Sequence, residues 1–252
     1  MDDSLFDQRP VRQVAARPGA GWDATAWPYS LAPVAHLLRE GLDVAPGVTF
    51  LVGENGSGKS TLVEAIAAAS GNNAEGGSRN ATYSSRATES PLHEQLQVIR
   101  SVGAPTWSYF LRAETMHGHL SYLEDLDDLY DERPRGASAR NPLHRMSHGE
   151  SFLAVFDQYF ARPGFYLMDE PESALSFTSC LVLIGVLDEL VRAGSQVVCA
   201  THSPILTALP GATILQVDDQ GLTQVEWRDL DVVDHFTRYL ANPTAYLRHL
   251  LE

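Results

Sequence analysis

Hydrophobic positions along the chain follow two spacings in turn, which predicts alternating strands and helices. Apolar residues at helical spacing occur at 61–70, 152–160 and 181–194. Short, largely apolar runs typical of buried strands occur at 48–52, 165–168 and 196–201, and an alternating segment lies at 107–114. We therefore predict an α/β fold in which helices cover both faces of a mostly parallel central sheet.

The segments around these elements are less regular. Residues 1–22 mix Arg, Pro, Gly and Ala without periodicity, which predicts a poorly ordered N-terminal segment before a single domain at 23–252. A helix is expected at about 92–101, within a helical and loop subdomain at about 72–148. Residues 212–252 are expected to form a small antiparallel β-hairpin followed by a helix.

The composition favours an ordinary globular protein over a membrane or secreted one. The 252 residues carry a formal net charge of −14, and 44% are hydrophobic. The longest nearly apolar stretch, at 180–187, is far shorter than the roughly 20 residues of a membrane-spanning helix. The N-terminus lacks a secretory signal pattern, and Cys180 and Cys199 stand alone. We expect a cytoplasmic chain without a membrane span, whose charge disfavours non-specific nucleic-acid binding.

A glycine-rich segment follows the apolar run at 48–52 and matches G-x-x-x-x-G-K-[ST], the pattern of a P-loop. Its backbone N–H groups would wrap an anion at a helix N-terminus, Lys59 would reach the outer phosphates, and Ser60 would bind Mg²⁺. Lys59 is also the only lysine in a chain with 18 Lys and Arg residues. The residues expected to bind the nucleotide are Gly53, Glu54, Asn55, Gly56, Ser57, Gly58, Lys59, Ser60 and Thr61.

Two carboxylates follow the apolar run at 165–168. At the end of a strand the chain can turn both Asp169 and Glu170 toward the phosphate crevice. Asp169 would hold Mg²⁺ through water, and Glu170 would orient and deprotonate an attacking water. The structural alternative is a pair of solvated acids before a proline turn, which the P-loop disfavours.

Two further motifs are ambiguous when each is taken alone. Ser147 and Glu150 form a capping box for the helix predicted at 152–160, although the same helix N-terminus could bind an anion. His202 follows the apolar run at 196–201, where a lone histidine is more often structural.

Taken together, the motifs resemble the Walker A, signature, Walker B with D-loop, and H-loop sequences of ABC-type ATPases. The matching segments are GENGSGKST, MSHGE, FYLMDEPESALS and ATHSP, and the likeness spans about residues 27–215. The whole chain is similar to compact bacterial ATPases of this type, often labelled AAA family ATPases, and to the heads of SMC and RecF proteins.

This resemblance implies that two copies of the chain sandwich two ATP molecules with Mg²⁺ and hydrolyse ATP. His202 would sense or stabilise the terminal phosphate beside Glu170. The expected catalytic residues are Glu170, His202 and Lys59. The signature residues that would act in trans on the other copy's nucleotide are Ser147, His148, Gly149 and Glu150. The expected metal ligands are Ser60, Asp169 and, in the place of the Q-loop glutamine, Glu114.

The chain departs from the family pattern at several positions. The usual L-S-G-G-Q reads MSHGE, Ser176 replaces the D-loop aspartate, and Glu114 replaces the Q-loop glutamine. Trp27 and Tyr29 are weak candidates for the aromatic residue that stacks on adenine, and core packing is the favoured role for both.

The resemblance predicts a soluble ATPase that drives a conformational or partner-directed process with an unidentified partner protein. The altered signature and Q-loop favour this reading over an ATP-binding subunit of an ABC transporter. A second alternative is a nucleotide-gated binding module with little turnover, related to DNA repair, and the substitutions at Glu150 and Ser176 keep it open. Nucleic-acid binding is not favoured, although arginines before the signature could support it: Arg133, Arg135, Arg140 and Arg145.

Overall fold

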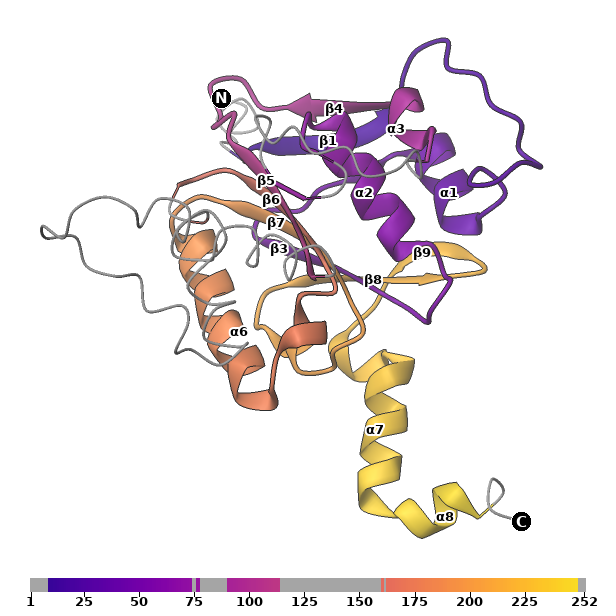
Figure 1. Ribbon diagram of the computed structural model, residues 1–252, viewed down its shortest axis with the longest axis vertical. Coiled ribbons are helices and arrows are strands. Elements are labelled where there is room, and N and C mark those ends of the chain that lie inside the picture. The colour runs from indigo at the N-terminus through magenta and orange to yellow at the C-terminus, as the bar shows by residue number, and fades with distance from the viewer. Residues whose placement is uncertain (1–8, 74–75, 78–89, 114–159, 161, 249–252) are drawn as a thin grey trace, which may run out of the picture.

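Two sheets of unequal size organise the computed structural model, which describes residues 9–73, 76–77, 90–113, 160 and 162–248 (Figure 1). The larger sheet has six strands in the order β5-β6-β7-β3-β8-β9. Its parallel strands are β3 (Val48–Val52), β5 (Ser108–Arg112), β6 (Phe165–Asp169), β7 (Gln196–Thr201) and β8 (Thr213–Asp218). The sixth strand, β9 (Gly221–Gln224), pairs antiparallel with β8. The predicted α/β fold with a mostly parallel sheet is confirmed.

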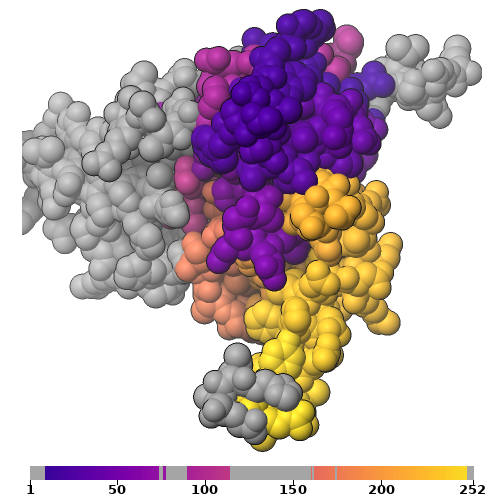
Figure 2. All heavy atoms as spheres, turned by 90° about the vertical axis from the view of Figure 1, so that its right-hand side faces the viewer, coloured from indigo at the N-terminus to yellow at the C-terminus, as the bar shows by residue number. Residues whose placement is uncertain are grey.

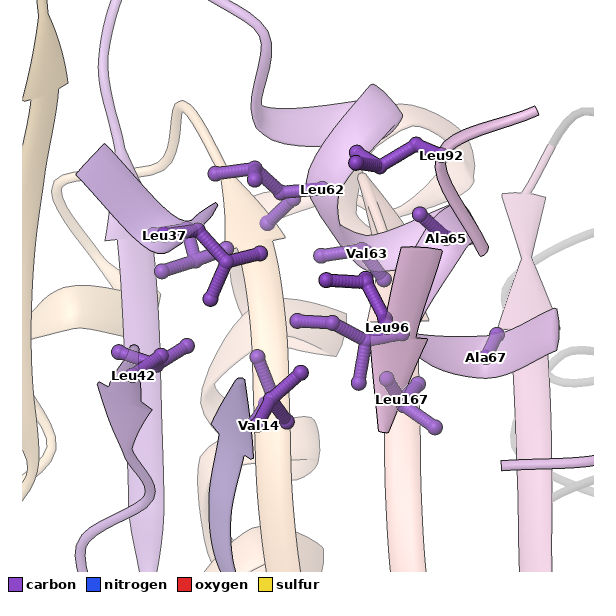
Figure 3. Close-up of a cluster of buried hydrophobic side chains, with 14 of the residues drawn as sticks. Val14, Leu37, Leu42, Leu62, Val63, Ala65, Ala67, Leu92, Leu96 and Leu167 are labelled. Carbon is purple, nitrogen blue, oxygen red and sulfur yellow. The ribbon is translucent and has the colours of Figure 1, made fainter. Parts of the chain in front are cut away.

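Helices cover both faces of the larger sheet. The helices α1 (Ala32–Glu40), α2 (Lys59–Ala69) and α3 (Leu92–Gln95) lie on one face, and α6 (Phe177–Arg192) lies on the other. Successive residues of a strand point to opposite faces, so Leu51 of β3 packs with α2 and Phe50 packs with α6. Figure 3 shows the first of these clusters, where α1, α2 and α3 contribute Leu37, Leu62 and Leu92.

The smaller sheet corrects two predictions from the sequence. It is antiparallel, with the order β2 (Leu42–Asp43), β1 (Val11–Ala16) and β4 (Leu96–Arg100). Residues 11–16 are therefore an ordered strand with Val11 and Val14 fully buried, within the segment predicted to be poorly ordered. The helix predicted at 92–101 ends at Gln95, because the residues that follow pair with β1 as strand β4. Local periodicity cannot reveal this pairing, since β1 is far away in the sequence.

A buried glutamine joins the two sheets. Gln196, at the start of β7, is 1% exposed. Its side-chain oxygen accepts a hydrogen bond from the backbone N–H of Val11 at 2.9 Å. Its side-chain nitrogen donates to the carbonyls of Val44 at 2.8 Å and Ala45 at 2.9 Å. One amide thus satisfies backbone groups on both sides of the junction.

The C-terminal part follows the prediction for 212–252 where it is described. β8 and β9 form a hairpin that turns at Asp219 and Gln220. After η5 (Trp227–Asp229), the helices α7 (Asp231–Ala241) and α8 (Pro243–Leu247) extend beyond the rest of the domain, as Figures 1 and 2 show. Two further short helical turns are η3 (Pro171–Ala174) and η4 (Leu206–Ala208).

Several predicted elements lie outside the described residues, among them nearly all of the helix at 152–160 and most of the subdomain at 72–148. Cys180 and Cys199 are free thiols, and both are buried. In the part of the chain that the structure describes, no helix has the length and apolar character needed to cross a membrane.

Two glycines, one in a crowded position and one in an open position, allow a test of how the sheet is packed. A Cβ at Gly164 would lie 2.7 Å from both the carbonyl oxygen and Cδ1 of Trp107, whereas a Cβ at Gly185, on the exposed side of α6, would meet nothing within 4 Å. We expect Gly164→Ala to lower the free energy of unfolding by about 1–3 kcal/mol, because the strand ends must shift. Gly185→Ala should raise it by about 0.5–1 kcal/mol, because alanine loses less backbone entropy in a helix. Denaturant unfolding measures both, and equal effects would contradict this packing.

Candidate functional site

The carboxyl ends of three adjacent parallel strands meet at one edge of the sheet. Val52 of β3 lies opposite Thr201 of β7, and Asp169 of β6 lies opposite Ala200 of β7. The glycine-rich loop, the acidic pair and the predicted histidine each follow one of these strand ends. The sheet therefore brings together groups that are far apart in the sequence, at the edge where α/β proteins bind ligands.

The glycine-rich loop joins β3 to α2 without a side-chain cap on the helix. The residue before α2 is Gly58, whose φ of 98° lies in the left-handed region that favours glycine. Gly53 begins the loop where a Cβ would lie 2.2 Å from the carbonyl oxygen of Val217, so no side chain fits there. At the tip Glu54, Asn55 and Gly56 are exposed. The backbone N–H groups of the first turn of α2 are thus arranged as in an anion site.

Lys59, the first residue of α2, lies inside this loop. It is 3% exposed, and its Nζ donates a hydrogen bond to the carbonyl oxygen of Glu54 at 2.8 Å. Burial lowers the pKa of Lys59, and the negative charges of Glu170, Asp169 and Glu172 oppose that shift. The Lys59 cation therefore faces three carboxylates across the site. Ser60 and Thr61, which follow it, are half-buried.

The two carboxylates after β6 have different surroundings. Asp169 is 6% exposed, and its Oδ2 lies 3.9 Å from Nε of Arg112 on β5. Arg112 also forms a 2.7 Å ion pair with Glu64 of α2, so the P-loop helix, β5 and β6 are linked behind the site. Glu170 adopts φ 47°, the one positive φ of a non-glycine residue in the described chain. This left-handed turn ends the strand, in the strained geometry often found at functional positions.

Glu170 and His202 come together as the sequence predicts. Oε1 of Glu170 lies 3.0 Å from Nε2 of His202, which follows β7. The backbone N–H of Glu170 donates to the carbonyl of Ala200 at 2.9 Å, which holds the two chain segments in register. Both side chains are about one third exposed, so the pair lies at the surface of the crevice and can meet a ligand.

Glu172 is a site residue that the sequence reasoning missed. One oxygen of its carboxylate accepts two hydrogen bonds of 2.6 Å, from the hydroxyl of Thr201 and from the backbone N–H of His202. The residue thus ties the turn after Glu170 to the loop that carries the histidine. The available signal is the third acidic residue in the D-E-P-E segment, which follows the proline.

Other predicted site residues are placed differently. Glu114 and the signature residues at 147–150 lie outside the described residues. Ser176 caps α6, because its hydroxyl accepts a hydrogen bond from the N–H of Ser179 at 3.2 Å. Tyr29 is 8% exposed and stacks with Trp22, as expected of a core residue. Trp27 is 59% exposed, so the expectation of core packing is wrong for it.

The fold and this site define a P-loop nucleotide-binding protein. Family models match the chain as "AAA domain" at residues 36–102 and as "AAA domain, putative AbiEii toxin, Type IV TA system" at residues 118–208. Over 192 residues the chain is 33% identical to the cytochrome c biogenesis ATP-binding export protein CcmA of Rhodospirillum rubrum, a match that covers 69% of this chain and 76% of that protein. The chain belongs to the ABC-type P-loop ATPases and binds ATP.

Two solved structures match the chain at low sequence identity. The SMC head domain from Thermotoga maritima matches with a TM-score of 0.44 and 17% identity, over 74% of this chain and 93% of that one. A metal-chelate type ABC transporter in an inward-facing conformation matches with a TM-score of 0.48 and 16% identity, over 93% and 89%. Because both TM-scores are below 0.5, the fold is defined here by the observed order of strands in the sheet.

The single lysine allows a direct test of the phosphate site. An amine-acylating reagent can modify one side chain in this protein, Nζ of Lys59, and burial favours the reactive neutral amine by lowering its pKa. We expect ATP with Mg²⁺ to slow acylation of Lys59 about tenfold when ATP is present at roughly ten times its dissociation constant. Peptide mass spectrometry measures the modification, with the N-terminal amine as internal control. Equal labelling with and without ATP would contradict a phosphate contact at Lys59.

Proposed function

We propose that this protein is a soluble, cytoplasmic ATPase that hydrolyses ATP in a nucleotide-bound homodimer and uses the closure of that dimer to act on a partner protein. The observation that carries the proposal is the 3.0 Å contact between Glu170 and His202 at the strand ends facing Lys59. A carboxylate and an imidazole in this arrangement can hold and polarise a water beside a terminal phosphate.

In the proposed reaction Glu170 accepts the proton of the attacking water. One carboxylate oxygen contacts His202, and the other, which accepts no hydrogen bond from the part of the chain that the structure describes, can meet water at a surface that is about one third exposed. When Nε2 carries the hydrogen, His202 donates it to Glu170 and keeps the carboxylate oriented. Lys59 neutralises charge that develops on the outer phosphate oxygens. Binding and proton transfer thus fall to different side chains.

The residues at this edge suit Mg²⁺. The Ser60 hydroxyl would bind Mg²⁺ and the buried Asp169 carboxylate would hold it through water, because Mg²⁺ prefers oxygen donors. Glu114 is proposed as a further contact through water. When bound, the metal would offset the charge of the phosphate oxygens during hydrolysis.

Two observations support the proposed sandwich dimer: the chain belongs to a family of ATPases, and two residues of the site are partly exposed. Glu170 and His202 remain partly exposed at the crevice, where a second copy could cover them. In the proposed dimer, the signature residues of one copy reach the nucleotide of the other: Ser147, His148, Gly149 and Glu150. Closure would exclude water other than the attacking one and strengthen each electrostatic contact.

A second candidate function is that of an ATP-binding subunit of a transporter. It is favoured by the 33% identity to CcmA, which is named as an ATP-binding export protein. The two candidates differ in what the isolated chain can do. Dimerisation and turnover without any membrane component would support the first, and ATP binding without either would support the second.

Glu170→Gln tests the proposed base. The amide has nearly the same shape but cannot accept the water proton, so we expect kcat to fall by about a hundredfold or more while ATP binding persists. Phosphate release measures turnover, and light scattering in ATP measures the mass. The wild type should turn over, and the variant should accumulate as an ATP-bound dimer. Wild-type turnover in the variant would exclude Glu170 as the base.

Variants of Glu172 test whether this residue positions His202 for turnover. Glu172→Ala removes the acceptor that holds the N–H of His202, so we expect kcat to fall about 10- to 100-fold with little change in KM. Glu172→Gln keeps a side-chain oxygen for both hydrogen bonds and should restore most of the turnover. Thermal unfolding of both variants controls for stability. Equal losses in the two variants, or a change confined to KM, would contradict a positioning role.

A further inference from the structure

We propose that Arg112 is a positioning residue for the metal of this site, a role that rests on the proposed ATPase function. The two residues proposed to hold Mg²⁺, Ser60 and Asp169, lie on different elements, α2 and β6. The hydrogen bonds within a helix or a sheet do not join a helix to a strand, so side chains must set the spacing between these two residues. Arg112, at the end of β5, contacts both α2 and β6.

The contacts of Arg112 lead from the P-loop helix to the buried carboxylate. Glu64 follows Ser60 by four residues in α2, so the two side chains lie one helical turn apart on the same face. Oε1 of Glu64 lies 2.7 Å from Nη1 of Arg112. Nε of the same guanidinium lies 3.9 Å from Oδ2 of Asp169. Glu64, Arg112 and Asp169 thus form a brace between α2 and β6.

The sheet fixes the direction in which Arg112 points. β5 and β6 pair in parallel, with Arg112 directly opposite Asp169 at their carboxyl ends. Phe110, two residues before Arg112, packs in the core cluster that includes the residues of α2. Because alternate residues of a strand share a face, Arg112 also points toward α2 and reaches Glu64. Arg112 and Glu64 are each at most one quarter exposed, so water screens their ion pair less than a surface pair.

The shape of the arginine side chain suits this place. A guanidinium is a rigid planar fork, so its Nη1 and Nε can meet two carboxylates in fixed directions at once. A lysine carries the same charge on one nitrogen at the end of a flexible stem, and it cannot hold both partners in this way. The proposed role is therefore geometric: the brace holds Asp169 in place relative to Ser60 before the metal binds.

A positioning role and a purely electrostatic role predict opposite effects on metal binding. Arg112 is a cation near the proposed site of a divalent cation, so its charge alone disfavours Mg²⁺. If only this charge mattered, its removal would strengthen metal binding. If the brace matters, its removal weakens metal binding, because Ser60 and Asp169 are no longer held at the spacing that the metal requires.

The test measures metal binding without turnover, in the complex with a non-hydrolysable ATP analogue. With protein in excess over the analogue, the electron paramagnetic resonance signal of free Mn²⁺ gives the metal affinity of the wild type, Arg112→Ala, Arg112→Lys and the control Arg192→Ala. Arg192 forms an exposed ion pair with Asp188 within α6. We expect both Arg112 variants to weaken Mn²⁺ binding about tenfold, although Arg112→Lys keeps the charge. Binding of the metal-free analogue should be unchanged, and Arg192→Ala should change neither affinity.

The other end of the brace gives a second test. Glu64→Ala should weaken Mn²⁺ binding by a similar factor. The double variant Glu64→Ala/Arg112→Ala should bind Mn²⁺ as Arg112→Ala does, because both substitutions remove the same brace. Losses that multiply in the double variant would show two independent effects and would overturn the inference.

The outcomes separate this inference from the function on which it rests. If the wild type does not bind the analogue, the proposed function fails and the brace fails with it. If the wild type binds both analogue and Mn²⁺, then equal or tighter Mn²⁺ binding in the Arg112 variants overturns the positioning role while the proposed function stands. Thermal unfolding checks that each variant folds, and Arg112→Lys decides the question if Arg112→Ala does not.

Discussion

β3 is hydrogen-bonded on both sides, to β7 and to β8, in parallel register along its length. Because the strands are parallel, their carboxyl ends lie at one edge, and each chemical group of the site follows one of those ends. The P-loop follows β3, the acidic pair closes β6, and the histidine follows β7. Gln196 reinforces this arrangement, since it anchors the start of β7 to the smaller sheet. A shift of one strand by a single residue would separate Glu170 from His202.

The same edge concentrates charge of one sign. Asp169, Glu170 and Glu172 face one lysine, and Asp169 is almost fully buried. Burying an uncompensated charge is costly, so each carboxylate has a partner: Arg112 lies beside Asp169, His202 beside Glu170, and two donors bind Glu172. These partners hold the side chains before any ligand arrives. A pre-organised site loses less entropy when it binds its ligand.

The parts that could be predicted from the sequence are those in which neighbouring residues act together. The P-loop is one contiguous pattern between a strand and a helix, and β3 occupies the predicted residues 48–52. Long-range pairing was not predictable in the same way. The strand at 11–16 gains its order from β4, and local periodicity predicts a helix at the residues of β4 because it does not reveal their partner strand. Glu172 was missed for a related reason, since its role depends on Thr201, which lies on another strand.

This distinction also applies to the hollow of about 920 Å³ that lies beside the P-loop. Phosphates are bound by backbone N–H groups and one lysine, so a short local motif is sufficient to specify them. The other walls of this hollow have no such motif, because they come from α1, from the end of β8 and from a helix that begins after the last strand. Only the fold brings Leu31 and Phe236 into the lining of the same hollow.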